Sequence, residues 1–274
     1  MKVMKFGGTS VGSPDRMKNV ASLITESGDP TFVVLSAMSG TTNSLIEISN
    51  YLYKKNPDGA NEVINKLEKK YMQHVEELYS TDEYKEKTRE FLREEFKYMR
   101  SFTKDIFTSF EEKSIVAQGE IMSTNMVLNY LQEQGIKATL LSAFDFMRTD
   151  KNAEPDAQYI KEKLTAIMTE NEGYQIYITQ GFICLNAYGE IDNLQRGGSD
   201  FTASLIGVAL GAEEIQIWTD IDGMHNNDPR IVDETDAIRQ LHFEEAAELA
   251  YFGAKILHPT CVQPAKYAGI PVRL

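Results

Sequence analysis

Glycines stand beside lysine and hydroxyl side chains near the N-terminus, a combination suited to binding an anion. Lys5 precedes the turn Gly7-Gly8-Thr9-Ser10, whose nearly bare backbone can point N–H groups at an anion where a helix starts. The turn differs from a Walker loop, in which lysine follows the second glycine, because Gly12 is followed here by Ser13. The Gly7-Gly8 pair alone is also what a tight strand-to-helix corner needs.

A second loop of small hydroxyl residues is Ser36-Ala37-Met38-Ser39-Gly40-Thr41-Thr42-Asn43. Its serines and threonines can serve simply to cap the helix that follows. Both loops come directly after apolar strands that we expect to be neighbours in one sheet. Together they therefore predict a paired anion-binding edge at the carboxyl ends of these strands.

A third motif, Gln195-Arg196-Gly197-Gly198-Ser199-Asp200, leads straight into a helix. Arginine can hold a carboxylate through two parallel hydrogen bonds, and an acid at a helix start can bind an ammonium group. The alternative is a plain N-cap from Ser199 or Asp200 with Arg196 solvated.

Two further loops lie in the C-terminal third. Trp218-Thr219-Asp220-Ile221-Asp222-Gly223, with Asp228-Pro229-Arg230 shortly after it, follows a strand, and its composition is also that of an ordinary turn. Gly253-Ala254-Lys255-Ile256-Leu257-His258-Pro259 places a lysine between a helix end and a proline. Lys255 there could merely complement a helix C-terminus.

The elements that carry these loops alternate between strand and helix. A helix starts at Ser13-Pro14-Asp15, and a hairpin is predicted over residues 182–194. Further helices, the first predicted to be amphipathic, span residues 199–212 and 243–252. Strands are predicted over residues 2–6, 31–37, 137–142, 175–179, 214–219 and 270–274. This order predicts a mainly parallel sheet with helices on both faces.

Residues 51–113 are rich in Glu and Lys, with apolar residues at helical spacing, and interrupt this alternation. We interpret them as a helical insertion into one αβ domain, with a separate helical domain as the alternative.

The chain has 274 residues and a formal net charge of -13, from 28 Lys plus Arg against 41 Asp plus Glu. Such a charge opposes binding to nucleic acid and anionic lipid, so a phosphorylated ligand must be held by a few placed cations. No apolar stretch reaches the roughly 18 residues of a membrane span. Cys184 and Cys261 lack disulfide-framework or zinc spacing, and we expect buried thiols in a reducing cytoplasm.

Taken together, five motifs resemble the catalytic domain of aspartokinases, and the match runs through the whole sequence. They are Lys5-Phe6-Gly7-Gly8-Thr9-Ser10-Val11, Gln118-Gly119-Glu120, Arg196-Gly197-Gly198-Ser199-Asp200, Trp218-Thr219-Asp220 with Asp228-Pro229-Arg230, and Gly253-Ala254-Lys255-Ile256-Leu257-His258-Pro259. The resemblance implies a three-layer αβα sandwich of the amino-acid kinase type over residues 1–274. It also implies ATP-dependent phosphorylation of the β-carboxylate of L-aspartate, with Mg²⁺, in lysine, threonine and methionine biosynthesis.

The resemblance also assigns roles to residues. Lys5 and Asp200 would be catalytic, Lys5 offsetting charge on the transferring phosphoryl group. Substrate would be held by Ser36, Thr42, Glu120, Phe182, Arg196 and Ser199. Nucleotide would be held by Lys5, Gly7, Gly8, Ser39, Gly40, Thr219, Asp220, His225, Arg230 and Lys255. No general base is needed, because the acceptor carboxylate is already ionised at neutral pH, and we name no protein ligand to magnesium.

Two departures from the aspartokinase pattern stand out. His225 replaces a tyrosine that many relatives carry, and the sequence stops at Leu274, where aspartokinases usually continue into a regulatory region. In a full-length protein we expect a homo-oligomer. The alternatives are a kinase of the same fold acting on glutamate, N-acetylglutamate or carbamate, and a catalytically silent binding module. Arg196 with Glu120 favours an acceptor with a free amino group, and retention of Lys5 with Asp200 argues against a silent module.

Overall fold

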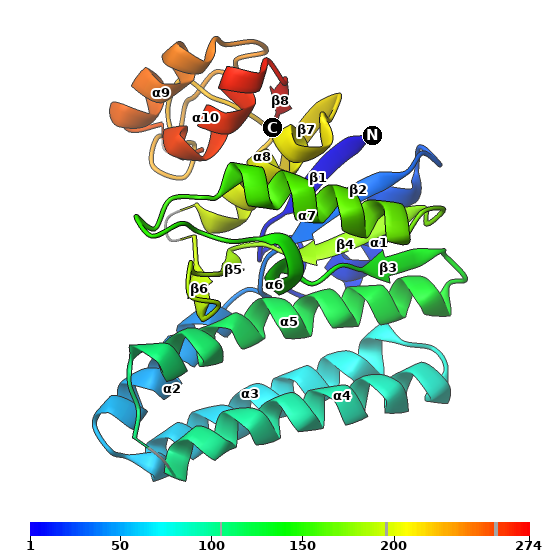
Figure 1. The fold of residues 1–274 in the computed structure, drawn as a ribbon, viewed down its shortest axis with the longest axis vertical. Coiled ribbons are helices and arrows are strands. Elements are labelled where there is room, and N and C mark those ends of the chain that lie inside the picture. Colours follow the sequence, from blue (N-terminus) through cyan, green and yellow to red (C-terminus); the bar gives the residue numbers. More distant parts are fainter. Residues whose placement is uncertain (105, 195–196, 255–256) are drawn as a thin grey trace.

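The computed structural model describes residues 1–104, 106–194, 197–254 and 257–274, in which six strands form one sheet (Figure 1). The strands are ordered β3-β4-β2-β1-β7-β8, and each neighbouring pair is parallel. Their bounds are β1 Lys2–Phe6, β2 Thr31–Leu35, β3 Ala138–Leu140, β4 Ile176–Gln180, β7 Glu214–Trp218 and β8 Val272–Arg273. The predicted parallel sheet is therefore confirmed.

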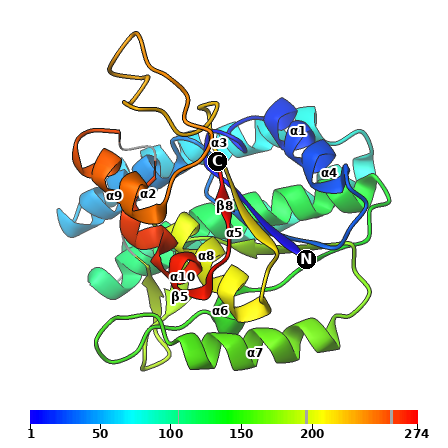
Figure 2. The same ribbon diagram turned by 90° about the horizontal axis from the view of Figure 1, so that it is seen from above.

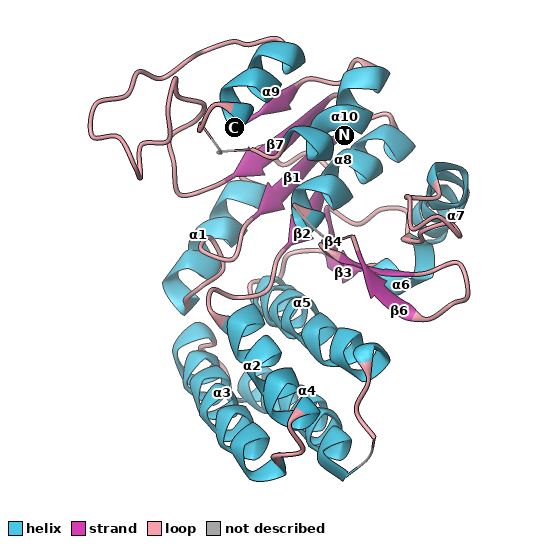
Figure 3. Cartoon of the chain, turned by 90° about the vertical axis from the view of Figure 1, so that its left-hand side faces the viewer, coloured by secondary structure: helices cyan, strands magenta, loops and turns pink. Residues whose placement is uncertain are grey.

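Helices cover both faces of this sheet (Figures 2 and 3). Alternating strand residues point to opposite layers, so Met4 and Phe6 of β1 join one hydrophobic cluster and Val3 joins the other. The first layer contains α1 Pro14–Thr25, α2 Thr41–Tyr53 and α5 Ser109–Glu133; the second contains α6 Ala143–Phe146, α7 Ala157–Glu170, α8 Gly198–Leu210 and α10 Pro259–Ala268. The three-layer αβα architecture is as expected.

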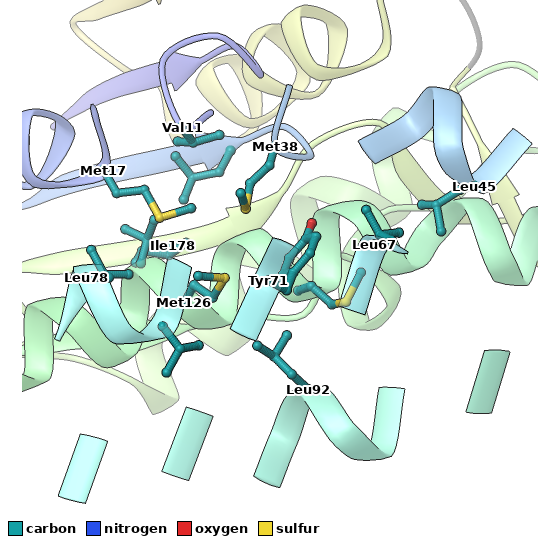
Figure 4. Close-up of a cluster of buried hydrophobic side chains, with 14 of the residues drawn as sticks. Val11, Met17, Met38, Leu45, Leu67, Tyr71, Leu78, Leu92, Met126 and Ile178 are labelled. Atoms are coloured by element: carbon teal, nitrogen blue, oxygen red, sulfur yellow. The ribbon is translucent and has the colours of Figure 1, made fainter. Parts of the chain in front are cut away.

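The insertion consists of α3 Pro57–Leu78, α4 Asp82–Ser101 and a short 3₁₀ turn, Phe102–Lys104. These helices pack beside α2 and α5, on the side of the molecule away from α9 Phe243–Tyr251 (Figures 1 and 3). Their apolar stripes share one hydrophobic cluster with the sheet, centred on fully buried residues such as Tyr71 (Figure 4). The insertion is thus continuous with the core of the first layer.

Local sequence explains the helix that follows the first glycine turn. Ser13 caps α1 by accepting a hydrogen bond from the Arg16 amide at 3.4 Å, Pro14 occupies the first helical position, and Asp15 lies in the first turn. Helix α1 therefore starts where the sequence predicted.

Several details differ from the prediction. Helices α7 and α10 were not predicted, although Asp156 caps α7 and Pro259 opens α10. Helix α8, predicted to be amphipathic, is buried at most positions because it lies between the sheet and α7 and α10. Strands β5 Ile183–Leu185 and β6 Ile191–Asn193 form the predicted hairpin. Both cysteines are buried.

Within the described residues, no helix has the length and apolar character that crossing a membrane requires.

Candidate active site

The loops after β1 and β2 are joined at the carboxyl edge of the sheet. Phe6 pairs with Leu35 in register, and beyond this pair the Ser39 amide donates to the Gly8 carbonyl at 3.0 Å. A Cβ on Gly8 would lie 2.8 Å from the Ala37 carbonyl oxygen, so only glycine allows this approach. The two loops predicted to form one edge are therefore packed against each other.

Lys5 and Asp200 form an ion pair inside this edge. Lys5 Nζ lies 2.8 Å from Asp200 Oδ1, and the two side chains are 12% and 17% exposed. Strand β1 supplies the lysine and the first turn of α8 supplies the aspartate. Partial desolvation strengthens the attraction, and it makes removal of either partner costly because the other charge is left unpaired. Asp200 thereby holds the Lys5 ammonium in a fixed position.

A cavity of about 540 Å³ opens at this pair. Its walls come from the β1 and β2 loops, the middle of α5 and the start of α8. They comprise Lys5, Gly8, Thr9, Ser36, Ala37, Met38, Ser39, Gly40, Thr42, Asn43, Glu120, Phe182, Gly197, Gly198, Ser199 and Asp200. The size suits a small ligand with a phosphate group.

Glu120 brings a second carboxyl group to this cavity from α5. It is 4% exposed, Oε1 accepts a hydrogen bond from the Ala37 amide at 3.2 Å, and Oε2 has no partner among the described residues. Burial raises the pKa of Glu120 to about 8, against the smaller opposing effect of the Ala37 amide. A buried carboxyl with an unused oxygen is suited to receiving a cationic group.

Glycine next to Glu120 permits the close packing of α5 on the β2 loop. A Cβ on Gly119 would lie 2.8 Å from the Ala37 methyl carbon and 3.2 Å from Leu45. The Gln118-Gly119-Glu120 motif therefore combines a carboxyl group with the space needed to bring it to the cavity.

Phe182 and Ser199 close the cavity from the α8 side. Phe182 adopts φ 68°, a left-handed conformation that a bulky residue rarely takes, and its amide donates to Thr202 Oγ1 at 3.0 Å. A Cβ on Gly198 would lie 2.4 Å from the Phe182 ring. Ser36 Oγ donates to Ser199 Oγ at 2.9 Å, linking the β2 loop to α8. These contacts fix the predicted substrate residues relative to Lys5.

Thr219 and Asp220 line a different hollow, of about 380 Å³, between α1 and the ends of β1 and β7. Thr9 lines both cavities, so the Gly7-Gly8 turn separates them. The Phe6 and Trp218 rings stack at 5.7 Å between centroids and form part of its apolar wall. Of the predicted nucleotide residues, Lys5, Gly8, Ser39 and Gly40 line the first cavity and Thr219 and Asp220 line the second, whereas Gly7, His225 and Arg230 line neither.

The side chains of His225 and Arg230 find their hydrogen-bond partners within the segment that follows β7. His225 Nε2 lies 2.7 Å from Asp222 Oδ1 and Nδ1 lies 2.9 Å from Thr235 Oγ1, so both ring nitrogens are occupied. In this arrangement neither ring nitrogen is open to the nucleotide that the resemblance assigns to His225, and the residue is buried.

Arg230 holds Asp228 in a bidentate pair, with distances of 2.9 Å from Nε and 2.7 Å from Nη2. This pairing lowers the pKa of Asp228 to about 2. Arg230, which the resemblance assigns to the nucleotide, is therefore paired with a carboxylate in this structure.

The Ser39 amide also differs from expectation, because its donation to Gly8 removes it from the groups available to a phosphate. Arg196 and Lys255, assigned to the substrate and the nucleotide, lie outside the described residues.

Sequence reasoning did not single out Thr9 or Asn43 as site residues. Both line the cavity at the Lys5–Asp200 pair, and both directly adjoin residues that were predicted. Position immediately after a glycine turn or inside the first turn of a helix was the available signal.

The chain combines a parallel αβα sandwich with a lysine-aspartate pair at the carboxyl edge of its sheet. The model of the amino acid kinase family matches residues 1–274, and the chain belongs to that family.

Among curated proteins, the lysine-sensitive aspartokinase 3 of Escherichia coli is 35% identical over 98% of this chain and 60% of its own length. Chloroplastic aspartokinase 1 of Arabidopsis thaliana is 36% identical over 99% of this chain and 49% of its own length. The structure of E. coli aspartokinase III with aspartate and ADP superimposes with a TM-score of 0.87 at 34% identity, covering 99% of this chain and 61% of that one. The chain therefore spans between about half and three fifths of these relatives.

Proposed function

We propose that the chain carries the catalytic site of an aspartokinase, which transfers the γ-phosphoryl group of ATP to the β-carboxylate of L-aspartate and forms 4-phospho-L-aspartate. The observation that carries the proposal is the Lys5–Asp200 ion pair at 2.8 Å in a cavity that also contains the unpaired oxygen of Glu120. The similar structure of E. coli aspartokinase III, which contains aspartate and ADP, supports this choice of ligands.

Each wall of the cavity has a part in this reaction. The Lys5 ammonium offsets the charge of the transferring phosphoryl group, and Asp200 keeps it in position. The aspartate ammonium pairs with Glu120, whose pKa then falls because an adjacent positive charge favours the carboxylate. Ser36, Thr42, Phe182 and Ser199 bound the acceptor. Arg196, by resemblance, clamps a substrate carboxylate.

The chemistry requires positioning and charge compensation more than proton transfer. An aspartate β-carboxylate has an ordinary pKa of about 3.9, so at neutral pH it attacks without a base. The γ-phosphorus–oxygen bond to ADP breaks as the new bond to the carboxylate oxygen forms, and ADP leaves with the electron pair. Backbone amides of the Gly7-Gly8 turn and of Gly40 are the donors that we assign to the phosphates.

Magnesium fits this site as a companion of the nucleotide. Among the described residues no group of three or more His, Cys, Asp or Glu side chains could hold a metal ion. Mg²⁺ typically keeps several waters and bridges phosphate oxygens, so it does not need a protein cage. When bound it would neutralise charge on the β- and γ-phosphates.

The test is to incubate the chain with MgATP and one of three acceptors, L-aspartate, L-glutamate or N-acetyl-L-glutamate, and to trap the acyl phosphate with hydroxylamine. We expect hydroxamate with aspartate alone. Hydroxamate with glutamate instead would replace the proposed substrate by another acceptor of the same fold. No product with any acceptor, together with intact MgADP binding by calorimetry, would overturn the proposed reaction and leave a nucleotide-binding module.

A further inference from the structure

The helical insertion contacts the loop between β2 and α2 through two consecutive residues of α3. Lys70 Nζ donates to the Ser39 carbonyl at 3.0 Å, and the Tyr71 hydroxyl lies 3.1 Å from Thr41 Oγ1. Ser39, Gly40 and Thr42 line the cavity, whereas Lys70 and Tyr71 do not. Both contacts therefore reach the site through the loop.

The Lys70 contact constrains the orientation of one peptide group at the exposed edge of the loop. Across a trans peptide the C=O and N–H groups point in opposite directions, so a carbonyl of Ser39 held by Lys70 directs the Gly40 N–H away from α3. Gly40 adopts φ 80°, which glycine tolerates without strain and which turns this peptide out of the helical path. The Gly40 amide has no partner among the described residues, and Gly40 borders the cavity.

The Ser39 carbonyl lies just outside helix α2. Gly40 is the N-cap, and its carbonyl accepts the first helical bond, from the Ser44 amide at 3.2 Å. The Ser39 carbonyl precedes this cap and accepts from Lys70, while Thr42 and Asn43 of the first turn of α2 line the cavity.

Tyr71 anchors the same loop from a rigid base. Its side chain is fully buried, its ring meets Phe96 edge to face at 5.8 Å, and Figure 4 shows it standing among Leu67, Leu92 and Met126. Thr41, also fully buried at the first position of α2, forms this hydrogen bond through its Oγ1. The loop is therefore held by a side chain that cannot itself move without disturbing the core.

We propose that Lys70 and Tyr71 are positioning residues, through which the helical insertion aims the Gly40 amide at the phosphoryl group being transferred. The inference rests on the proposed function for the identity of the reaction. It assigns the insertion a part in catalysis, because disturbing α3 at this point displaces donors on the far side of the loop.

The orientation of the Gly40 amide can be observed without any turnover. The sequence contains two Ser-Gly dipeptides, Ser27-Gly28 and Ser39-Gly40. Labelling with carbonyl-¹³C serine and ¹⁵N glycine therefore gives two amide signals, and Gly28, beyond the end of α1, is an internal reference. We expect Lys70→Met to shift the Gly40 signal and leave the Gly28 signal unchanged. Addition of MgATP should move the Gly40 signal in the wild type and move it less in the variant.

Matched controls exist on α3 and at its C-cap. Lys66→Met removes the same charge one turn earlier, where Lys66 pairs with Glu62 on the surface. Tyr79→Phe removes another buried hydroxyl, which donates to the Met126 carbonyl at 2.8 Å, and is matched to Tyr71→Phe. Neither control residue lines the cavity.

In kinetics, we expect Lys70→Met to lower kcat/KM for MgATP about tenfold, with KM for aspartate within about twofold, since a small displacement of a donor is costly in an active site. Lys70→Arg should recover most of this loss, and Tyr71→Phe should lose about threefold by loosening the same loop. Lys66→Met and Tyr79→Phe should match the wild type.

The outcomes separate the two proposals. A Lys70→Met Gly40 signal identical to that of Lys66→Met, with equal MgATP binding, overturns the positioning role whether or not aspartate is phosphorylated. An inactive wild type whose Gly40 signal still responds to MgATP and to Lys70→Met overturns the proposed reaction and supports the positioning role. If Tyr71→Phe does not fold, Lys70→Met alone decides.

Discussion

The cavity at the Lys5–Asp200 pair and the segment after β7 differ in where the hydrogen-bond partners of their polar and charged groups come from. In the cavity, partners come from distant parts of the chain: Ser36 and Ser199 are 163 residues apart, and Ala37 and Glu120 are 83 apart. In the segment, His225 pairs with Thr235 ten residues away, and Arg230 pairs with Asp228 two residues away. The cavity therefore depends on the whole fold, whereas the segment satisfies itself locally.

This difference leaves polar groups free in one region and occupied in the other. Glu120 Oε2 and the Gly40 amide have no partners among the described residues, and both belong to residues that line the cavity. Arg230 and His225 already have theirs. Groups held by the fold but left unpaired can bind a ligand without first breaking a bond, so we expect the cavity residues to contribute more to catalysis.

The largest expected effect is that of Lys5→Met. Loss of the ammonium removes charge compensation at the phosphoryl group and leaves Asp200 unpaired, so kcat should fall at least about 10³-fold. Lys2→Met, on the same strand but at its other end, is the control and should keep full activity. Circular dichroism checks the fold of both. A folded Lys5→Met with wild-type turnover would contradict the conclusion that the cavity residues contribute most to catalysis.

Gly8→Ala tests whether the two loops must touch. The new methyl group would lie 2.8 Å from the Ala37 carbonyl, so the loops must separate at a cost of about 1–3 kcal/mol, and kcat should fall about 100-fold. Gly28→Ala is the matched control, because at φ 71° it also destabilises, by about 1 kcal/mol, but far from the cavity. Thermal unfolding and turnover are measured on both. Equal activity in the two variants would mean that loop contact is unimportant.

The same distinction explains what could be predicted from the sequence. Apolar runs, glycine turns and the Ser13 cap are local signals, and they gave the strand order along the chain and the positions of Lys5, Gly8 and Asp200 at one edge. Parallel strands then bring their carboxyl ends together without further information. The αβα fold followed from these signals, whereas the substrate residues Glu120, Phe182 and Ser199 were assigned by the resemblance to aspartokinases.

The features that could not be predicted are those that depend on which polar groups pair with each other in the folded chain. Nothing in the spacing of Asp228 and Arg230 distinguishes a bidentate internal pair from a cation kept for a nucleotide. The Ser39 amide appeared available until the Gly8 carbonyl was found opposite it. Helical spacing alone makes Tyr71 a core residue of its helix, and its hydroxyl contact with Thr41 arises only when α3 packs on α2.

Glu120→Gln addresses the acceptor itself. We expect KM for aspartate to rise about 30-fold, because a neutral amide replaces the charged partner of the substrate ammonium, while KM for MgATP changes little. Calorimetry in buffers of different ionisation enthalpy gives a second readout. With its pKa raised to about 8, Glu120 is largely protonated at pH 7, so aspartate binding should release close to one proton in the wild type and none in the variant.

The release should vanish above about pH 9, where the carboxyl is already ionised. The same raised pKa means that the folded protein binds more protons than the unfolded chain between about 4.5 and about 8. The free energy of unfolding should therefore fall with rising pH across this window, relative to Glu120→Gln, by at most about 1.4 kcal/mol per pH unit. Equal proton release in the two proteins would show that the aspartate ammonium binds elsewhere.

The smallest effect is expected at Arg230, where a phosphate must compete with a carboxylate already in place. Arg230→Lys loses the bidentate geometry but keeps a charge, and KM for MgATP should rise no more than about fivefold. Asp228→Asn should act in the opposite direction and tighten MgADP binding about threefold by releasing the guanidinium. Quenching of Trp218, the sole tryptophan, measures both affinities. A loss approaching that of Lys5→Met would mean that Arg230 breaks its pair with Asp228 to bind the nucleotide. The segment after β7 would then rearrange on binding instead of keeping its internal pairs.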